Sequence, residues 1–231
     1  MIEKSVEKRP SLNVVKTSIS KGKIISMKVI IALILIISSV YASEIQKARE
    51  AYAKGDFEKA FGIAKLLAAQ GNIDAKYELG GMYYKGQGTS KNMKKAIFWW
   101  EQSGEQGHVK AQENLVYMYR SGKEIQQNDK KYLYWLKKSA NKGSPEMQFM
   151  LAYMYSSGEE INKDKNKAFY WAEKASQQNH PNAQFMLGYM YCRGYGTSQN
   201  LEKCASLTRK FHNAGDHTAL SLWNEFSLDK L

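Results

Sequence analysis

The chain repeats one pattern every 36 residues, and this repeat limits its fold more than any other feature of the sequence. Four copies align without an insertion: Leu79–Tyr83, Leu115–Tyr119, Leu151–Tyr155 and Leu187–Tyr191. A fixed period of this length is typical of a stack of supersecondary units in which each unit contacts only its neighbours. Such a stack is a solenoid, and solenoids usually present a long binding face instead of a catalytic pocket.

Each period contains two helical patterns. The first, helix A, has one apolar stripe at i, i+4, i+7 and i+8, which in the first copy comprises Ala75, Leu79, Met82 and Tyr83. A glycine, which takes positive φ without strain, follows helix A in every copy: Gly86, Gly122, Gly158 and Gly194. The second, helix B, begins after a column of good N-cap residues: Asn92, Asn128, Asp164 and Asn200.

These helix pairs predict an all-α fold, a right-handed superhelical α-solenoid of antiparallel helix pairs. Residues 43–72 are expected to form an N-terminal capping helix pair, residues 73–216 the four repeats, and residues 217–231 a C-terminal capping helix. One column of large side chains on helix B is predicted to lie in the core: Trp99, Trp135 and Trp171.

Residues 27–42 have the pattern of a secretory signal peptide. A basic start precedes the apolar residues 29–37, and small residues near Ala42 predict cleavage after that residue. The mature chain is therefore expected to be secreted or periplasmic. The apolar stretch is short for a membrane span, and an uncleaved membrane anchor is the alternative. Because Met27 stands directly before this unit, residues 1–26 are expected to be a disordered upstream extension.

The formal net charge is +12 for the whole chain and +7 for residues 43–231. Most of the remaining lysines lie in loops and on helix B, where a solvated face accounts for them. No motif for RNA or DNA accompanies these lysines. We therefore expect no nucleic acid partner, and contact with a membrane only if the N-terminal apolar segment is uncleaved.

The columns of the two helices resemble the Sel1-like repeat, a relative of the tetratricopeptide repeat. The residues of the first copy that match this repeat are Ala75, Leu79, Gly80, Met82, Tyr83, Gly86, Gly88, Lys95, Ala96 and Trp99. The resemblance covers roughly residues 45–228. Copies two and three depart from it at Glu124 and Glu160, which stand where the second loop glycine belongs. The conformation of these two loops is therefore left open.

The resemblance implies an adaptor that binds a protein or peptide partner, and the chain is expected to be a monomer without a cofactor. Two alternatives remain open. One is an anchored envelope scaffold. The other follows from a cysteine-rich branch of the family, which is described as binding or hydrolysing penicillin-type antibiotics.

That branch places a cysteine pair in each repeat, from the start of helix A to the end of helix B. This chain has only Cys192 and Cys204, around the turn between the two helices of the last copy. Projection on a helical wheel directs Cys192 away from its own helix B and Cys204 toward helix A. Because these directions oppose pairing, we predict two free or loosely paired thiols.

No catalytic residue or metal site is assigned. The Ser-x-x-Lys tetrad of serine acylases occurs at Ser139 but also at four other serines, without the accompanying Ser-Asp-Asn or Lys-Thr-Gly motifs, which indicates chance. His108 and His180 share a helix-start column and are assigned to capping. His212 and His217 have no acidic partner at metal-ligand spacing.

Aromatic residues stand on the side of helix A opposite the apolar stripe, where residues that meet only water should be polar. In tetratricopeptide-like stacks the A helices line the concave face, so the resemblance implies an aromatic groove with cations able to hold a carboxylate. The alternative is that neighbouring A helices pack together and bury the same rings. The predicted partner-binding residues are Tyr77, Tyr84, Lys110, Tyr117, Arg120, Phe149, Tyr153, Phe185, Tyr189 and Arg193.

Overall fold

The structure, a computed structural model, describes residues 29–32, 43–122 and 125–231. Every regular element within these ranges is helical, and the helices follow one another as an all-α repeat solenoid, as the sequence predicted. The expected upstream extension lies outside the described residues, and so does the expected signal peptide apart from residues 29–32. No helix in the described ranges is both long and apolar enough to cross a membrane.

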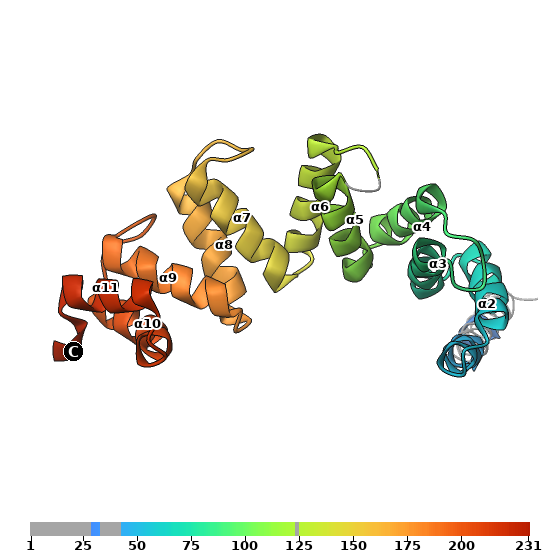
Figure 1. The fold of residues 1–231 in the computed structure, drawn as a ribbon, viewed down its shortest axis with the longest axis horizontal. Helices are drawn as coiled ribbons and strands as arrows, with labels where there is room; N and C mark the ends of the chain where they lie inside the picture. Colours follow the sequence, from blue (N-terminus) through green and yellow to red (C-terminus); the bar gives the residue numbers. More distant parts are fainter. Residues whose placement is uncertain (1–28, 33–42, 123–124) are drawn as a thin grey trace, which may run out of the picture.

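The four repeats and the cap helix α2 that precedes them consist of helices of equal length (Figure 1). They are α2 (Phe57–Ala69), α3 (Ile73–Lys85), α4 (Met93–Glu105), α5 (Val109–Ser121), α6 (Asp129–Asn141), α7 (Pro145–Ser157), α8 (Lys165–Gln177), α9 (Pro181–Arg193) and α10 (Leu201–Asn213). A helix over residues 43–53 precedes them, and α11 (His217–Phe226) and the short helix η1 (Leu228–Lys230) follow. The A helices are α3, α5, α7 and α9, and the B helices are α4, α6, α8 and α10.

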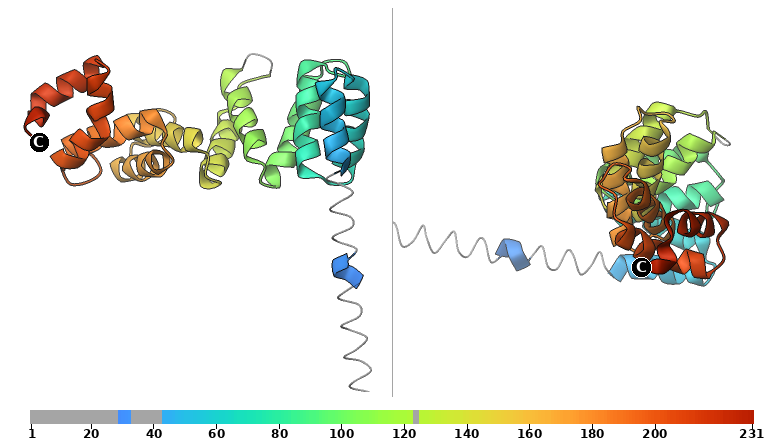
Figure 2. Two further views of the ribbon diagram at one scale, coloured as in Figure 1. Left: turned by 90° about the horizontal axis from the view of Figure 1, so that it is seen from below. Right: turned by 90° about the vertical axis from the view of Figure 1, so that its left-hand side faces the viewer.

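Each helix packs against the one before it and the one after it along the chain. The direction of the helices turns from one repeat to the next, and the two further views show an elongated body from the side and overlapping repeats from the end (Figure 2). This arrangement follows from the sequence pattern, because a unit with one apolar stripe on each helix can bury it only against neighbouring units.

Cap chemistry fixes where the helices begin and end. The four predicted N-cap residues of the B helices each accept a hydrogen bond from the backbone N–H three residues later, at 2.9 to 3.0 Å. The four glycines that follow the A helices all have left-handed backbone, with φ between 62° and 84°. Both predictions are confirmed. Pro145 and Pro181 stand at the starts of α7 and α9, where a missing backbone N–H costs little.

Two of the loops that join A to B helices reach back to the preceding helix pair. In the first and last repeats a Cβ atom on Gly88 or Gly196 would lie only 2.0 or 2.2 Å from the backbone oxygen of Phe57 or Lys165. Glu160 takes the same left-handed conformation, with φ of 61° against 66° at Gly88. A side chain at this position excludes so close an approach to the preceding helix. Glu124 lies outside the described residues.

The predicted tryptophan column lies only partly in the core. Trp135 is 3% exposed, whereas Trp99 and Trp171 are half-buried. In the first repeat the neighbouring Trp100 is the buried ring, and its indole N–H donates to the backbone oxygen of Tyr77 at 3.1 Å. Gly80 makes room for it, because a Cβ there would lie 2.5 Å from Trp100. The small residue on helix A thus decides which tryptophan enters the core.

Cys192 and Cys204 form a disulfide, so the prediction of free or loosely paired thiols was wrong. Their Cα atoms are 5.2 Å apart, within the usual range for a bridge, and both residues are fully buried. The helical wheel gave directions within one helix but ignored position along it. Cys192 lies in the last turn of α9 and Cys204 in the first turn of α10, so the antiparallel hairpin brings the two residues together at one end.

A buried phenol provides a pH-dependent probe of this core. Burial raises the pKa of Tyr132 from its ordinary value of 10.0 to about 12. Its hydroxyl lies 3.4 Å from the sulfur atoms of Met150 and Met154, which are weak acceptors. The fold therefore favours the neutral phenol, and the stability that this provides is fully present below pH 10 and is lost as the pH rises toward 12.

Between pH 10 and pH 12, the free energy of unfolding should fall by up to about 2 kcal/mol more in the parent chain than in Tyr132→Phe, which has no hydroxyl to titrate. Urea unfolding followed by circular dichroism at several pH values measures the difference. Tyr153→Phe, which changes an exposed ring, should follow the parent chain over the same range. Parallel pH profiles for Tyr132→Phe and the parent chain would contradict burial of the hydroxyl.

Candidate functional site

The candidate site is the surface that the A helices present away from their partners, here called the A face. Its members are the predicted residues Tyr77, Tyr84, Lys110, Tyr117, Arg120, Phe149, Tyr153, Phe185, Tyr189 and Arg193. Three of these, one per repeat in α5, α7 and α9, are large exposed rings: Tyr117 at 47%, Tyr153 at 52% and Tyr189 at 39% exposure. Because these rings are not in the core, they are free to contact a partner.

Rings one helical turn earlier pack against other parts of the chain, two against the start of the next A helix and one against helix B of its own repeat. Tyr77 stacks on the imidazole of His108 with centroids 4.3 Å apart, and Phe149 stacks on His180 at 4.9 Å. Phe185 meets Phe211 of α10 edge to face at 5.1 Å. These three rings are half-buried. The A face thus combines a packed aromatic column with an exposed one.

His108 and His180 have a structural role in this arrangement, as the sequence indicated. Nδ1 of His108 accepts the N–H of Ala111 at 3.2 Å, and Nδ1 of His180 accepts that of Ala183 at 3.3 Å. Burial lowers the pKa of His108, which favours the neutral ring that can accept this bond. Both rings are therefore held in place under the aromatic column.

A first hollow lies between α3 and α5 and has a volume of about 370 Å³. Tyr77, Tyr84 and Tyr117 line it, and Trp100 contributes from α4. Gly81 occupies the column that carries an exposed tyrosine in the next three repeats, and a Cβ there would meet no atom within 4 Å. The missing ring therefore opens this hollow.

A second hollow of about 370 Å³ lies between α7 and α9. The residues lining it are Phe149, Tyr153, Ser156, Asn182, Phe185, Met186, Tyr189, Phe211 and Asp216. Four of them are predicted site residues. A further hollow of about 350 Å³ adjoins it, shares Tyr189 and Met186, and extends to Arg193 and Tyr195.

Polar side chains separate the two aromatic hollows. In α5 the aromatic column holds Glu113, whose carboxylate accepts a hydrogen bond from the Ser144 hydroxyl. Arg120 extends from the same helix to α7, where its guanidinium lies 3.9 Å from the sulfur of Met150. A ligand that spans both hollows would therefore pass a polar stretch.

The three predicted cations differ in what they already bind. Arg193 pairs with Glu225 of α11 at 2.6 Å and lies over the rings of Tyr189 and Phe226. Lys110 and Arg120 are exposed and make no ion pair among the described residues. A ligand carboxylate would have to displace Glu225 at Arg193, whereas Arg120 and Lys110 are free to receive it.

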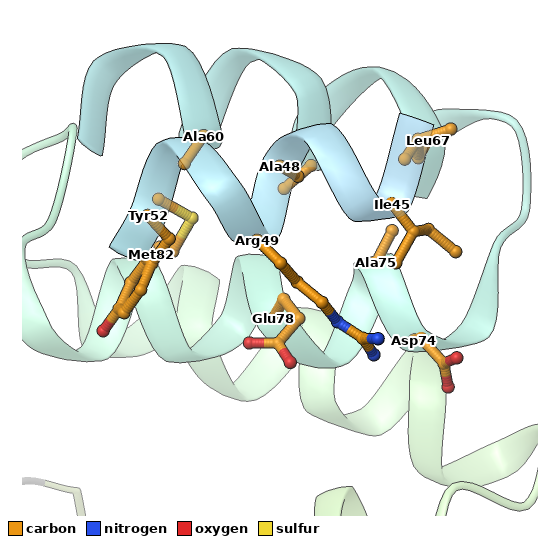
Figure 3. Close-up of a pocket in the computed structure, with 11 residues that line it drawn as sticks. Ile45, Ala48, Arg49, Tyr52, Ala60, Leu67, Asp74, Ala75, Glu78 and Met82 are labelled. Atoms are coloured by element: carbon orange, nitrogen blue, oxygen red, sulfur yellow. The ribbon is translucent and has the colours of Figure 1, made fainter. Parts of the chain in front are cut away.

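A fourth hollow, of about 270 Å³, was missed by sequence reasoning. Residues of the helix over 43–53, of α2 and of α3 line it, as Figure 3 shows. Ile45, Leu67 and Met82 form apolar walls, and Arg49 extends along the rim between Glu78 and Asp74. The signal in the sequence is a set of small residues where the helices meet: Ala48, Ala60, Ala64 and Ala75.

The serine tetrad is not a site. Ser139 is fully buried, and its hydroxyl has no hydrogen-bond partner among the described residues. A substrate cannot reach this oxygen without opening the core. In the described part of the chain, no three His, Cys, Asp or Glu side chains gather in a group that could hold a metal ion.

Helix pairs that pack in series, with hollows between successive A helices, define the chain as an α-solenoid. The Sel1 repeat family matches residues 73–108, 109–144, 145–180 and 181–216, with the same boundaries that the sequence period predicted. The chain therefore belongs to the Sel1 repeat family. Sel1 repeat proteins generally mediate protein–protein interactions. A comparison with curated proteins gives no match.

Solved structures show the same fold. A Sel1 repeat protein from Oxalobacter formigenes is 29% identical, with a TM-score of 0.63 over 73% of this chain and 49% of its own. The c5321 protein of uropathogenic Escherichia coli, described as a protective antigen displaying an SLR fold, is 27% identical, with a TM-score of 0.65 over 78% of this chain and 39% of its own. This chain thus spans half or less of the length of these relatives.

Proposed function

We propose that the chain binds a protein or peptide partner on its A face. The observation that carries this proposal is the exposed column of Tyr117, Tyr153 and Tyr189, one ring on each of three successive A helices. Tyrosine is enriched at binding hot spots because it provides a large contact area and a hydroxyl at a low cost in conformational entropy. Exposed rings beside hollows provide both an anchor surface and pockets for the partner's side chains.

The arrangement favours a particular kind of partner segment. Two aromatic hollows can each take an apolar side chain, and Arg120 between them can take a carboxylate through two parallel hydrogen bonds. A segment with two apolar anchors and an acidic residue between them matches this order.

Export is the second part of the proposal. We infer that the mature chain is secreted or periplasmic, supported by the basic start, apolar stretch and small residues over 27–42. Mass spectrometry of the exported chain should then find Ser43 at or near the N-terminus. An intact chain that stays with the membrane would replace this proposal with an anchored scaffold.

The double substitution Tyr153→Ser/Tyr189→Ser tests binding at the A face. A partner is first identified by co-purification, and its affinity for the parent and variant chains is then measured by calorimetry. We expect a loss of about 1–2 kcal/mol for each ring, a tenfold or greater change in the dissociation constant. The stability of the variant should change little, because both rings are about half exposed.

The matched control is Leu66→Ser, which removes an exposed apolar side chain from α2 and should leave the affinity unchanged. Two outcomes would contradict the proposal. One is an unchanged affinity in the double variant. The other is a loss of several kcal/mol of folding stability, which would assign the rings to packing between repeats.

A further inference from the structure

A second row of exposed rings follows the B helices. Phe98 in α4 is 51% exposed, and Tyr134 in α6 and Tyr170 in α8 are each 48% exposed. They occupy one column of the repeat, 36 residues apart, so each marks the same outer position on its helix. Rings at positions that meet only water gain nothing from burial on folding, and a repeated row of them marks an interaction surface.

Each ring is held by its neighbour in the chain. Phe98, Tyr134 and Tyr170 meet the following tryptophan edge to face, with centroids 4.9 to 5.1 Å apart. The hydroxyl of Tyr134 also donates to Glu105 of α4 at 2.7 Å. Rings already fixed in this way lose little conformational freedom when a partner covers them.

Lysines surround the rings. On a helix the neighbours of a residue stand three and four positions away, and around the three rings these positions hold eight lysines and two glutamates. The lysines are Lys94, Lys95, Lys130, Lys131, Lys137, Lys138, Lys167 and Lys174. We call the three rings with these lysines the B face.

Part of this positive charge is not neutralised by the protein itself. Lys131 pairs with Glu101 at 2.8 Å, Lys138 pairs with Glu105, and Lys167 pairs with Asp164. Lys94, Lys130 and Lys137 are exposed and make no ion pair within the described ranges. Lys130 and Lys137 flank Tyr134, so the centre of the B face combines an apolar ring with two free ammonium groups.

We propose that the B face binds an acidic segment of a protein partner, with apolar side chains on the three rings and carboxylates on the surrounding lysines. The surface is complementary to such a segment in charge and in apolar character. This site is separate from the A face, so the proposal stands independently of the function proposed above.

Two other polyanions fit the surface less well. The helices turn from one repeat to the next (Figure 1), so a flat bilayer would reach only part of the row, whereas an extended chain can follow all of it. The helices α4, α6 and α8 contain lysine but no arginine, which is the preferred side chain for phosphate and nucleobase contacts. An extended acidic polypeptide can follow the turning row of rings, and its carboxylates can pair with lysine.

Fluorescence anisotropy with a defined probe tests the proposal. The probe is a labelled twenty-residue glutamate peptide with phenylalanine at every fourth position, titrated with the purified chain at low and at high salt. We expect binding that weakens with salt. Two variants should each weaken it at least about tenfold, Lys130→Glu/Lys137→Glu and Phe98→Ser/Tyr134→Ser/Tyr170→Ser.

The control Lys54→Glu/Lys65→Glu makes the same change in net charge on exposed residues away from the B face and should change the affinity less than about threefold. An equal loss of affinity in this control would show that net charge alone causes the effect, and it would overturn the proposal. Tighter binding of single-stranded RNA or of phosphatidylglycerol vesicles than of the peptide would also overturn it. Because the A face also suits apolar and acidic side chains, the titrations are repeated in the Tyr153→Ser/Tyr189→Ser background. Both B-face variants should weaken binding there at least about tenfold as well, and an unchanged affinity of these variants in that background would overturn the proposal.

Discussion

Replacing Trp135 with alanine should lower the free energy of unfolding by about 3–5 kcal/mol. The ring is 3% exposed and lies against the glycine of α4 at position 104, where a Cβ atom would be only 2.9 Å from it. So close a contact between successive repeats leaves a cavity when the ring is removed, because the backbones of α4 and α6 cannot close it. Urea unfolding followed by circular dichroism measures the loss.

The other two tryptophans of this column provide a comparison for the loss of stability. Trp99→Ala and Trp171→Ala remove half-buried rings and should cost less than Trp135→Ala, while Lys94→Ala on the surface should stay within about 0.5 kcal/mol of the parent chain. Equal losses at all three tryptophans would show that the helices rotate to bury each ring alike. That result would contradict the packing described for α4 and α8.

The substitution Gly88→Ala should lower the free energy of unfolding by about 2–5 kcal/mol. Left-handed backbone costs a residue with a Cβ about 1–2 kcal/mol, and forced contact in a packed region adds about 1–3 kcal/mol. Both terms apply, since φ is 66° and the added Cβ would lie 2.0 Å from the backbone oxygen of Phe57. A backbone oxygen, unlike the end of a flexible side chain, cannot move away at low cost.

Gly71→Ala is the matched control for this prediction. Its φ of 95° carries the backbone strain, but no atom lies within 4 Å of the added Cβ. The difference between the two variants in thermal or urea unfolding therefore isolates the contact with α2. If both variants lost the same stability, the loop after α3 would not approach the preceding repeat as described.

Local rules were sufficient for most of the fold. The period set the repeat boundaries, and the caps set the helix ends, because cap residues act through bonds within four residues of their own position. The disulfide was missed because its geometry depends on two helices at once. The half-buried position of Trp99 was missed for a similar reason, since Gly80 on α3 makes room for the neighbouring Trp100 of α4.

The candidate site was predictable in composition but not in shape. Helical projection placed Tyr117, Tyr153 and Tyr189 away from the core stripe, where the structure has them exposed. The projection could not distinguish rings that stack on the next repeat, such as Tyr77 on His108, from rings that do not. Nor could it show hollows, which result from the absence of side chains, as at Gly81 and at the alanines lining the hollow beside Arg49.

The position of the disulfide gives the two ends of the molecule different mechanical characters. Helices at the ends of a stack have a neighbour on one side only, so such arrays fray inward from their ends. The bridge between α9 and α10 crosslinks the hairpin next to the C-terminal cap, and α10 therefore cannot peel away from α9 there. The opposite end has no such crosslink among its described residues, so unzipping of the array should start with the helices over 43–69 and proceed toward the clamped end.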